Sequence, residues 1–235
     1  MSYAEAQSGL WPGKPLSAKE IRELEEKGDK GDREALACLF DYYIYENRNK
    51  ALLWARKGDK LGDARSRYLL GGLLVVCNDP KDRAEGITVL KKAADQDYFL
   101  AQDMLADIYE EGEVVQKDLL MAEKWFGKAA MQGSTTSMLE LVRLMTDRAT
   151  IMRTLSEAYG WTFLMLKRTT SKWSQPFVDK IHEAQREIIK KAKGLRIDEK
   201  KVISGAESWA KKQDVNVPMV DPMDRPEPEC KYWKK

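Results

Sequence analysis

The sequence predicts an all-α protein: an α-solenoid of helix–turn–helix repeats with a helical C-terminal cap and an extended tail. Two observations predict it. A phrase of the form AxxWxxK recurs at steps of 35 or 36 residues, and apolar residues between the copies follow the 3, 4, 7 spacing of a buried helical stripe. A fixed period of this length is typical of stacked supersecondary units, because one unit cannot bury its own apolar face alone.

Each copy of the phrase is followed, five positions later, by a small or turn-forming residue. In chain order the copies are Ala51, Trp54, Lys57 and Gly62; then Gly86, Val89, Lys92 and Asp97; then Ala122, Trp125, Lys128 and Gly133; and a decayed copy at Ala158, Trp161, Leu164 and Thr169. The tryptophans follow a small residue by one turn, from which a large ring can wedge between helical layers. We interpret them as core residues rather than as a binding site.

Residues 1–16 contain glycines and prolines too often for a helix, and we expect a flexible N-terminal arm there. Ser17 and Glu20 have the spacing of a capping box, which predicts a helix from Ala18 to Lys27 that ends at Gly28. Gly31 aligns with Gly62 and Gly133, so this helix is the second half of a degenerate leading unit. The repeat array is expected to span residues 17–182.

The helices of the array follow from apolar stripes. These comprise Ala35, Leu36, Leu39, Phe40, Tyr43 and Ile44; Ala64, Leu69, Leu70 and Leu73; Ala101, Met104, Leu105, Ile108 and Tyr109; and Leu141, Leu144 and Met145. After the array, two more polar helices are predicted at 174–193 and 198–212, separated by Gly194; residues 183–212 are assigned to a helical C-terminal cap. Residues 213–235 carry four prolines and are predicted to be an extended tail.

Composition excludes several classes of protein. The formal net charge is +2, too small for a global field that would attract nucleic acid or an anionic membrane. No run of eighteen apolar residues exists, so no membrane span is expected. The N-terminus has neither a basic n-region nor an apolar h-region, so the sequence as written predicts a cytoplasmic protein; a mature chain that had lost its leader would be periplasmic.

The three cysteines, Cys38, Cys77 and Cys230, are odd in number and scattered. They have neither the density of a disulfide framework nor the paired spacing of a zinc site. Cys38 lies in an apolar helical stretch and is interpreted as a small core residue. A bridge from Cys38 or Cys77 to Cys230 is the alternative.

Residues 101–133 closely resemble a Sel1-like repeat, whose pattern is roughly AxxxLGxxYxxGxGVxxDxxxAxxWYxKAAxxG. The matching residues are Ala101, Leu105, Tyr109, Gly112, Val114, Asp118, Ala122, Trp125, Lys128, Ala129, Ala130 and Gly133. Departures are Ala106, Glu113 and Phe126. The resemblance covers residues 18–182 and implies a right-handed solenoid related to tetratricopeptide arrays. Physically, Gly112 is predicted to take a positive φ and Asp118 to cap the next helix.

No constellation for catalysis, a cofactor or a metal is present in the sequence. The single histidine, His182, lies in a polar helix, and no phosphate-cradling or nucleophile-elbow motif occurs. Gly71-Gly72 lies in an apolar helical stretch and indicates close helix packing. We therefore expect a protein that is not an enzyme and that binds no cofactor, metal or small-molecule substrate. Basic and aromatic residues alternate at 231–235 and around 168–173, which keeps single-stranded nucleic-acid binding as a distant alternative.

The resemblance implies a concave groove lined by the first helix of each pair. By the repeat register, the residues expected to face it are Glu34, Ala37 and Asp41; Arg65, Tyr68 and Val75; Leu100, Asp103, Asp107 and Glu110; and Thr136, Leu139 and Arg143. The alternative interpretation is that each is simply a solvent-facing helix position. Together they mix aromatic, apolar and charged side chains, as protein-recognition surfaces do.

The function expected from this pattern is protein binding without catalysis. Bacterial proteins that resemble Sel1-like repeats include immunity proteins that neutralise toxic secreted effectors such as lipases. A compact array without another domain favours such an effector inhibitor, which would cover the active site of its toxin. The alternative is an adaptor, scaffold or regulator of a signalling or envelope process that binds peptides weakly.

Overall fold

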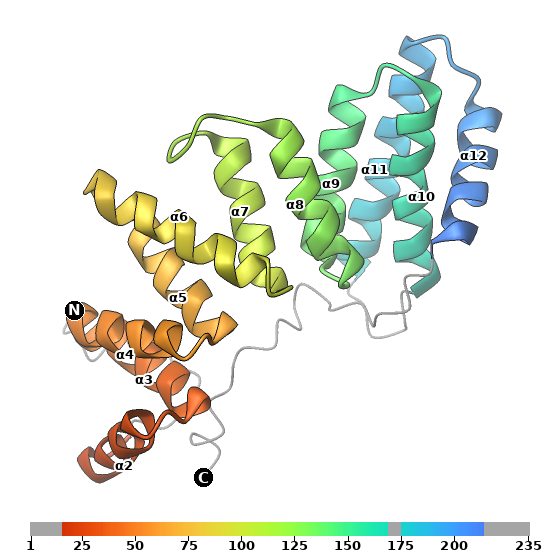
Figure 1. Cartoon of the computed structure of the whole chain (residues 1–235). Coiled ribbons are helices and arrows are strands. Elements are labelled where there is room, and N and C mark those ends of the chain that lie inside the picture. The colour runs from red at the N-terminus through yellow and green to blue at the C-terminus, as the bar shows by residue number, and fades with distance from the viewer. Residues whose placement is uncertain (1–15, 169–174, 214–235) are drawn as a thin grey trace, which may run out of the picture. The chain divides into compact units, whose positions relative to one another are not determined.

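The computed structural model describes residues 16–168 and 175–213, and every regular element in these ranges is an α-helix (Figure 1). The chain divides into two compact units at the junction between Tyr98 and Phe99. The predicted arm, apart from Leu16, and nearly all of the predicted tail lie outside the described residues. None of the described helices combines the length and the apolar character that a bilayer crossing requires.

In the first unit the structure describes five helices. They are α2 (Ala18–Asp29), α3 (Arg33–Glu46), α4 (Arg48–Lys60), α5 (Ala64–Val75) and α6 (Pro80–Ala94). Helices α3 and α4 form one hairpin and α5 and α6 the next, while α2 packs on α3 as a leading half-unit. The predicted capping box is confirmed, because the Ser17 hydroxyl accepts from the backbone of Glu20 while the Glu20 carboxylate accepts from the backbone of Ser17.

Six helices are described in the second unit. They are α7 (Phe99–Glu111), α8 (Leu119–Met131), α9 (Thr135–Arg148), α10 (Met152–Arg168), α11 (Gln175–Gly194) and α12 (Glu199–Lys212). Helices α7 to α10 pack in chain order, but α12 packs chiefly on α10 and only slightly on α11 (Figure 1). Gly160 allows this approach, since a Cβ there would collide with the ring of Trp209. The division into array, cap and tail stays a prediction, although its boundary at residue 182 falls inside α11.

The turns between repeats confirm the alignment of the glycines. Gly31, Gly62 and Gly133 have φ values of 85°, 71° and 97°, in the left-handed region that favours glycine. In the weaker copy the aligned residue is Asp97, which adopts the same conformation with a φ of 60°. Gly112 also has the predicted positive φ, and Asp118 caps α8 by accepting from the backbone of Leu120 and Met121. The turn geometry is thus conserved between repeats even where glycine is not.

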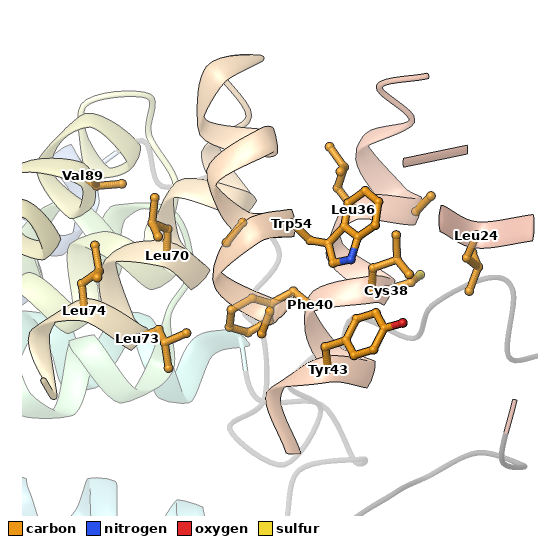
Figure 2. Packing of buried hydrophobic residues seen from close by; sticks show 14 residues of the cluster. Leu24, Leu36, Cys38, Phe40, Tyr43, Trp54, Leu70, Leu73, Leu74 and Val89 are labelled. Atoms are coloured by element: carbon orange, nitrogen blue, oxygen red, sulfur yellow. The ribbon is translucent and has the colours of Figure 1, made fainter. Parts of the chain in front are cut away.

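The core position of the repeated phrase is buried in all four copies, at Trp54, Val89, Trp125 and Trp161. In the first unit, Trp54 lies in a cluster with Leu24, Leu36, Leu39 and Tyr43 (Figure 2). The lysine of the phrase covers the ring one turn away: the Nζ atom of Lys57 lies 4.0 Å from the Trp54 ring centroid. Lys128 lies 4.3 Å from the Trp125 centroid. The interpretation of the tryptophans as core residues is confirmed.

The cysteines differ from the simplest expectation. Cys38 is completely buried among these apolar side chains, as predicted (Figure 2). Its sulfur atom is disulfide-bonded rather than a thiol. Cys77 is a free thiol whose sulfur accepts a 3.3 Å hydrogen bond from Arg48. Helical spacing identified Cys38 as buried but carries no information about the bonding of its sulfur atom.

Candidate protein-binding face

The residues predicted to face a groove lie on the first helices of the hairpins, α3, α5, α7 and α9. We call their solvent-accessible side chains the first-helix face, and we describe the part in each unit separately. In the first unit it comprises Glu34, Asp41, Arg65 and Tyr68. In the second unit it comprises Leu100, Asp103, Asp107, Glu110, Leu139 and Arg143.

In the first unit, α3 and α5 are joined across this face by an ion pair. The Arg65 guanidinium lies 3.1 Å from the Asp41 carboxylate, and their side chains are 23% and 21% exposed. Glu34 lies nearly two turns before Asp41 on the same side of α3 and is half-buried. The pair therefore belongs to the packing between consecutive repeats as well as to the accessible surface.

An aromatic pair adjoins this ion pair. The rings of Tyr68 and Tyr98 lie 5.5 Å apart between centroids, at a tilt of 47°. Burial raises the pKa of Tyr98 to about 12, while the charge of Arg65 acts in the opposite direction. Tyr98 was not among the residues predicted for this face, because it follows the turn at Asp97 and stands outside the helical register used for the alignment.

In the second unit, hydrogen bonds and ion pairs tie α7 to α9. The Ser137 hydroxyl on α9 donates to Asp103 on α7, and Arg143 forms an ion pair with Glu110. Arg143 also contacts Glu140 at 2.8 Å and Asp147 at 3.6 Å. One guanidinium thus holds carboxylates from both helices. Desolvation, the largest single effect, lowers the pKa of Arg143, but the hydrogen bonds to Glu140 and Glu110 and the charges of these carboxylates raise it overall.

Asp107 lies between these two connections and has a different environment. Its carboxylate is exposed to solvent and has no hydrogen-bond or ion-pair partner among the described residues. Partial loss of hydration among the surrounding helices, together with the charges of Asp103, Glu111, Glu140 and Glu110, raises its pKa to about 7. In the described part of the chain, the carboxylates of these five residues outnumber the guanidinium of Arg143, so this part of the face is acidic.

The prediction that a side chain faces the groove is wrong for two residues of the set. Ala37 is only 1% exposed and Val75 only 8%, so neither presents a side chain to a partner. Val75 is covered because α6 crosses α5 there: a Cβ on Gly86 would lie 2.9 Å from the Val75 backbone nitrogen. Ala37 lies in a run of α3, Ala35 to Phe40, in which every residue is buried. Thr136, Leu100 and Leu139 are half-buried.

The described residues contain no group of three or more histidine, cysteine or acidic side chains placed to hold a metal ion. His182 is exposed on α11, and its Nδ1 atom lies 3.3 Å from the side-chain oxygen of Gln185. The basic and aromatic segments that suggested nucleic-acid binding lie, apart from Arg168, outside the described residues. The first-helix face is thus the candidate site that the described part of the chain offers.

Comparison with known proteins identifies the fold. No protein-family model matches the sequence, and no curated protein matches it. Among solved structures, the chain is similar to a protective antigen present in uropathogenic Escherichia coli strains that displays an SLR fold. The TM-score is 0.64 at 20% identity, over 89% of this chain but only 43% of the antigen chain.

A second similar structure is a Sel1 repeat protein from Oxalobacter formigenes. It matches with a TM-score of 0.45 at 29% identity, over 52% of this chain and 97% of the other. The similarity to the antigen spans most of this chain, and it agrees with the helical hairpins and repeated turns described above. The chain has the SLR fold, an all-α solenoid, which confirms its predicted resemblance to Sel1-like repeat proteins.

Proposed function

We propose that the protein is a helical-repeat module that binds another protein through the first-helix face of its second unit. Asp107 carries the proposal. It is an accessible carboxylate with no hydrogen-bond or ion-pair partner among the residues that the structure describes, and it lies among four further carboxylates on α7 and α9. A lysine or arginine of a partner would relieve the repulsion that this cluster produces, so the expected contact surface of the partner is basic.

The neighbouring groups suit this role. Arg143 fixes Glu110 and Glu140, and Ser137 fixes Asp103, so the carboxylates around Asp107 are held in place before a partner arrives. Groups already held in place lose less conformational freedom on binding. Leu100 and Leu139, both half-buried on the same helices, add apolar area beside the charges.

We further propose that the partner is a toxic effector, a lipase being one class, and that the module acts as an immunity protein by blocking access to the effector's active site. The support is the resemblance to Sel1-like repeat proteins, some of which have this role. An adaptor that holds several peptides weakly would use the same face. Affinity separates the two, since neutralisation requires nanomolar binding, on the order of 12 kcal/mol, whereas exchangeable adaptors work near micromolar.

The deciding experiment is a pull-down from the native host followed by calorimetric titration of the recovered protein. We expect one stoichiometric partner and at least tenfold weaker binding by Asp107→Asn. The matched control is Glu183→Gln, an exposed carboxylate on α11 of the same unit, which should bind like the unmodified chain. Equal affinity of all three proteins would refute the proposed face, and several micromolar partners would favour the adaptor.

Inhibition gives a second, independent readout. If the recovered protein is a hydrolase, the stoichiometric complex should lose its activity toward macromolecular or lipid substrate. Full activity in the saturated complex would exclude the immunity role while leaving the binding face intact.

A further inference from the structure

We infer that one edge of the second unit binds the surface of a lipid bilayer that carries anionic headgroups. The connections α7–α8, α9–α10 and α11–α12 lie on the same side of this unit (Figure 1). Four large apolar side chains are exposed there, and we call them the apolar edge: Leu120, Ile151, Met152 and Leu195. In the described part of this unit, the one other exposed large apolar side chain is Met131, at the opposite end of α8.

An ion pair brings α8 close to the α9–α10 connection. Arg148, the last residue of α9, lies 2.7 Å from Glu123 of α8. Leu120 precedes Glu123 by about one turn of α8, and Ile151 and Met152 follow shortly after the end of α9. The apolar side chains of the two segments therefore lie on either side of this pair.

A second contact adds the α11–α12 connection. The Lys191 ammonium donates to the backbone carbonyl of Asp147, at the end of α9, over 3.1 Å. Leu195 follows Lys191 by about one turn, and its backbone nitrogen donates to the Lys191 carbonyl. Leu195 therefore joins the same edge, and the exposed apolar side chains can meet one extended surface together.

Cations accompany the apolar edge. Residues 190–201, around the α11–α12 connection, contain six Lys and Arg residues against two Asp and Glu residues. Four exposed cations have no ion-pair or hydrogen-bond partner for their side chains within the described ranges: Lys117, Lys124, Arg196 and Lys200. The net charge of the whole chain, +2, does not reveal this local excess.

Most carboxylates beside these cations are already engaged within the protein. Asp118 and Asp198 accept from backbone amides at the starts of α8 and α12. Glu199 forms an ion pair with Lys193 at 3.2 Å, and Glu113 stays unpaired in the part of the chain that the structure describes. The charge available to a ligand at this edge is therefore predominantly positive.

This combination fits an anionic bilayer. Apolar side chains enter the boundary between headgroups and acyl chains, while Lys and Arg contact the headgroup phosphates. Leu120 and Lys124 show both features on one face of α8, because residues four apart on a helix are neighbours. The groups are spread over three connections rather than along one helix, so an extended surface can contact all of them at once.

The test is co-sedimentation of the full chain with vesicles of phosphatidylcholine alone, or of phosphatidylcholine and phosphatidylglycerol in equal amounts. We expect binding to the mixed vesicles that weakens with added salt, and roughly tenfold weaker binding to the neutral ones. Leu120→Ser combined with Ile151→Ser should weaken binding to the mixed vesicles roughly tenfold or more, because apolar burial is lost. No binding to the mixed vesicles, or equal binding to both kinds, would overturn the inference.

Matched variants locate the contact. Met152→Ser should weaken binding, whereas Met131→Ser should not, although both side chains are 41% exposed. Lys200→Gln should weaken binding about fivefold, whereas Lys211→Gln at the other end of α12 should leave it unchanged. All four replaced side chains are exposed, so the variants should give the circular dichroism spectrum of the unmodified chain. Equal effects within both pairs would refute this edge as the contact.

Sedimentation without lipid separates the bilayer from a second copy of the chain as the occupant. We expect the same monomeric mass for the unmodified chain and for the Leu120→Ser, Ile151→Ser double variant. A dimer that the double variant dissociates would overturn the inference by assigning the apolar edge to self-association.

Discussion

Gly71 on α5 and Gly86 on α6 face each other where the two helices cross. A Cβ placed on either residue would lie 2.9 Å from the carbonyl oxygen of the other. Real Cβ atoms do not approach backbone this closely, and a helix backbone cannot shift as a flexible side chain can. The pair therefore sets the distance between the helices of the second hairpin.

Gly71→Ala and Gly86→Ala should each destabilise the protein by about 1–3 kcal/mol, because each forces α5 and α6 apart. The control is Gly127→Ala in the middle of α8, where an added Cβ meets nothing within 4 Å. This substitution should stabilise the protein by about 1 kcal/mol through helix propensity. Urea denaturation followed by circular dichroism measures all three, and a stabilising effect at Gly71 would contradict the close crossing.

Asp97 occupies the turn position that glycine holds in other repeats. Since left-handed backbone costs an L-residue roughly 1–2 kcal/mol, Gly133→Ala should destabilise the protein by about 1 kcal/mol. Asp97→Gly should have a smaller effect of the opposite sign, because aspartate tolerates this region better than alanine. Thermal unfolding of the two variants against the unmodified chain is the measurement. A destabilised Asp97→Gly would show that the aspartate side chain contributes more than its backbone strain costs.

The fold was predictable because each structural position of the repeat occurs several times in the sequence, so that the copies can be aligned. Trp54, Trp125 and Gly133 could be assigned from their spacing, and Val89 and Asp97 could be assigned by alignment although their residue types differ. Repetition gives no such help where a contact occurs once. The packing of α12 on α10 depends on the fit of Trp209 against Gly160, and helical spacing within each element does not show it.

The candidate site was predictable only as a set of positions. Helical register placed Asp103, Asp107 and Glu110 on one side of α7, but their environments depend on α9 as well. The two aspartates differ because Asp103 accepts a hydrogen bond from Ser137, whereas Asp107 has no such partner among the described residues. A repeat pattern encodes neither the buried state of Ala37 nor the bonded state of Cys38.

Asp107 should make stability fall as pH rises. Its pKa is about 7 in the folded chain and near the ordinary 3.8 in the unfolded chain, so the folded state binds more protons between these values. Stability attributable to this group is therefore fully present below pH 3.8 and is lost by about pH 7. Asp107→Asn should raise the urea midpoint at pH 8 relative to the unmodified chain. At pH 4 the midpoints of the variant and the unmodified chain should differ less.

The control for this pH effect is Glu183→Gln, which removes an exposed carboxylate from α11. Its midpoint should follow that of the unmodified chain at both pH values. Because Asp107 is accessible to solvent, added salt should reduce the effect of Asp107→Asn at pH 8. If Asp107→Asn raises the urea midpoint by the same amount at pH 4 and pH 8, the raised pKa of Asp107 does not cause the change in stability.

Two buried serines of the second unit differ in how their hydroxyls are satisfied. The Ser156 Oγ atom on α10 is buried and has no hydrogen-bond partner within residues 16–168 and 175–213. It lies 2.6 Å from where a Cβ on Gly205 would stand. The Ser137 hydroxyl donates to Asp103 and lies 2.7 Å from the Ser134 hydroxyl. A buried hydroxyl without a partner costs free energy, whereas a bonded one contributes about 1 kcal/mol.

Ser156→Ala should therefore leave the free energy of unfolding unchanged or raise it by about 1 kcal/mol, while Ser137→Ala should lower it by about 1 kcal/mol or more. The substitutions remove the same atom from buried positions, so the difference between them isolates the hydrogen bonds. Urea denaturation of both variants at pH 8 measures it. A loss of stability in Ser156→Ala equal to that in Ser137→Ala would mean that an ordered water satisfies Ser156.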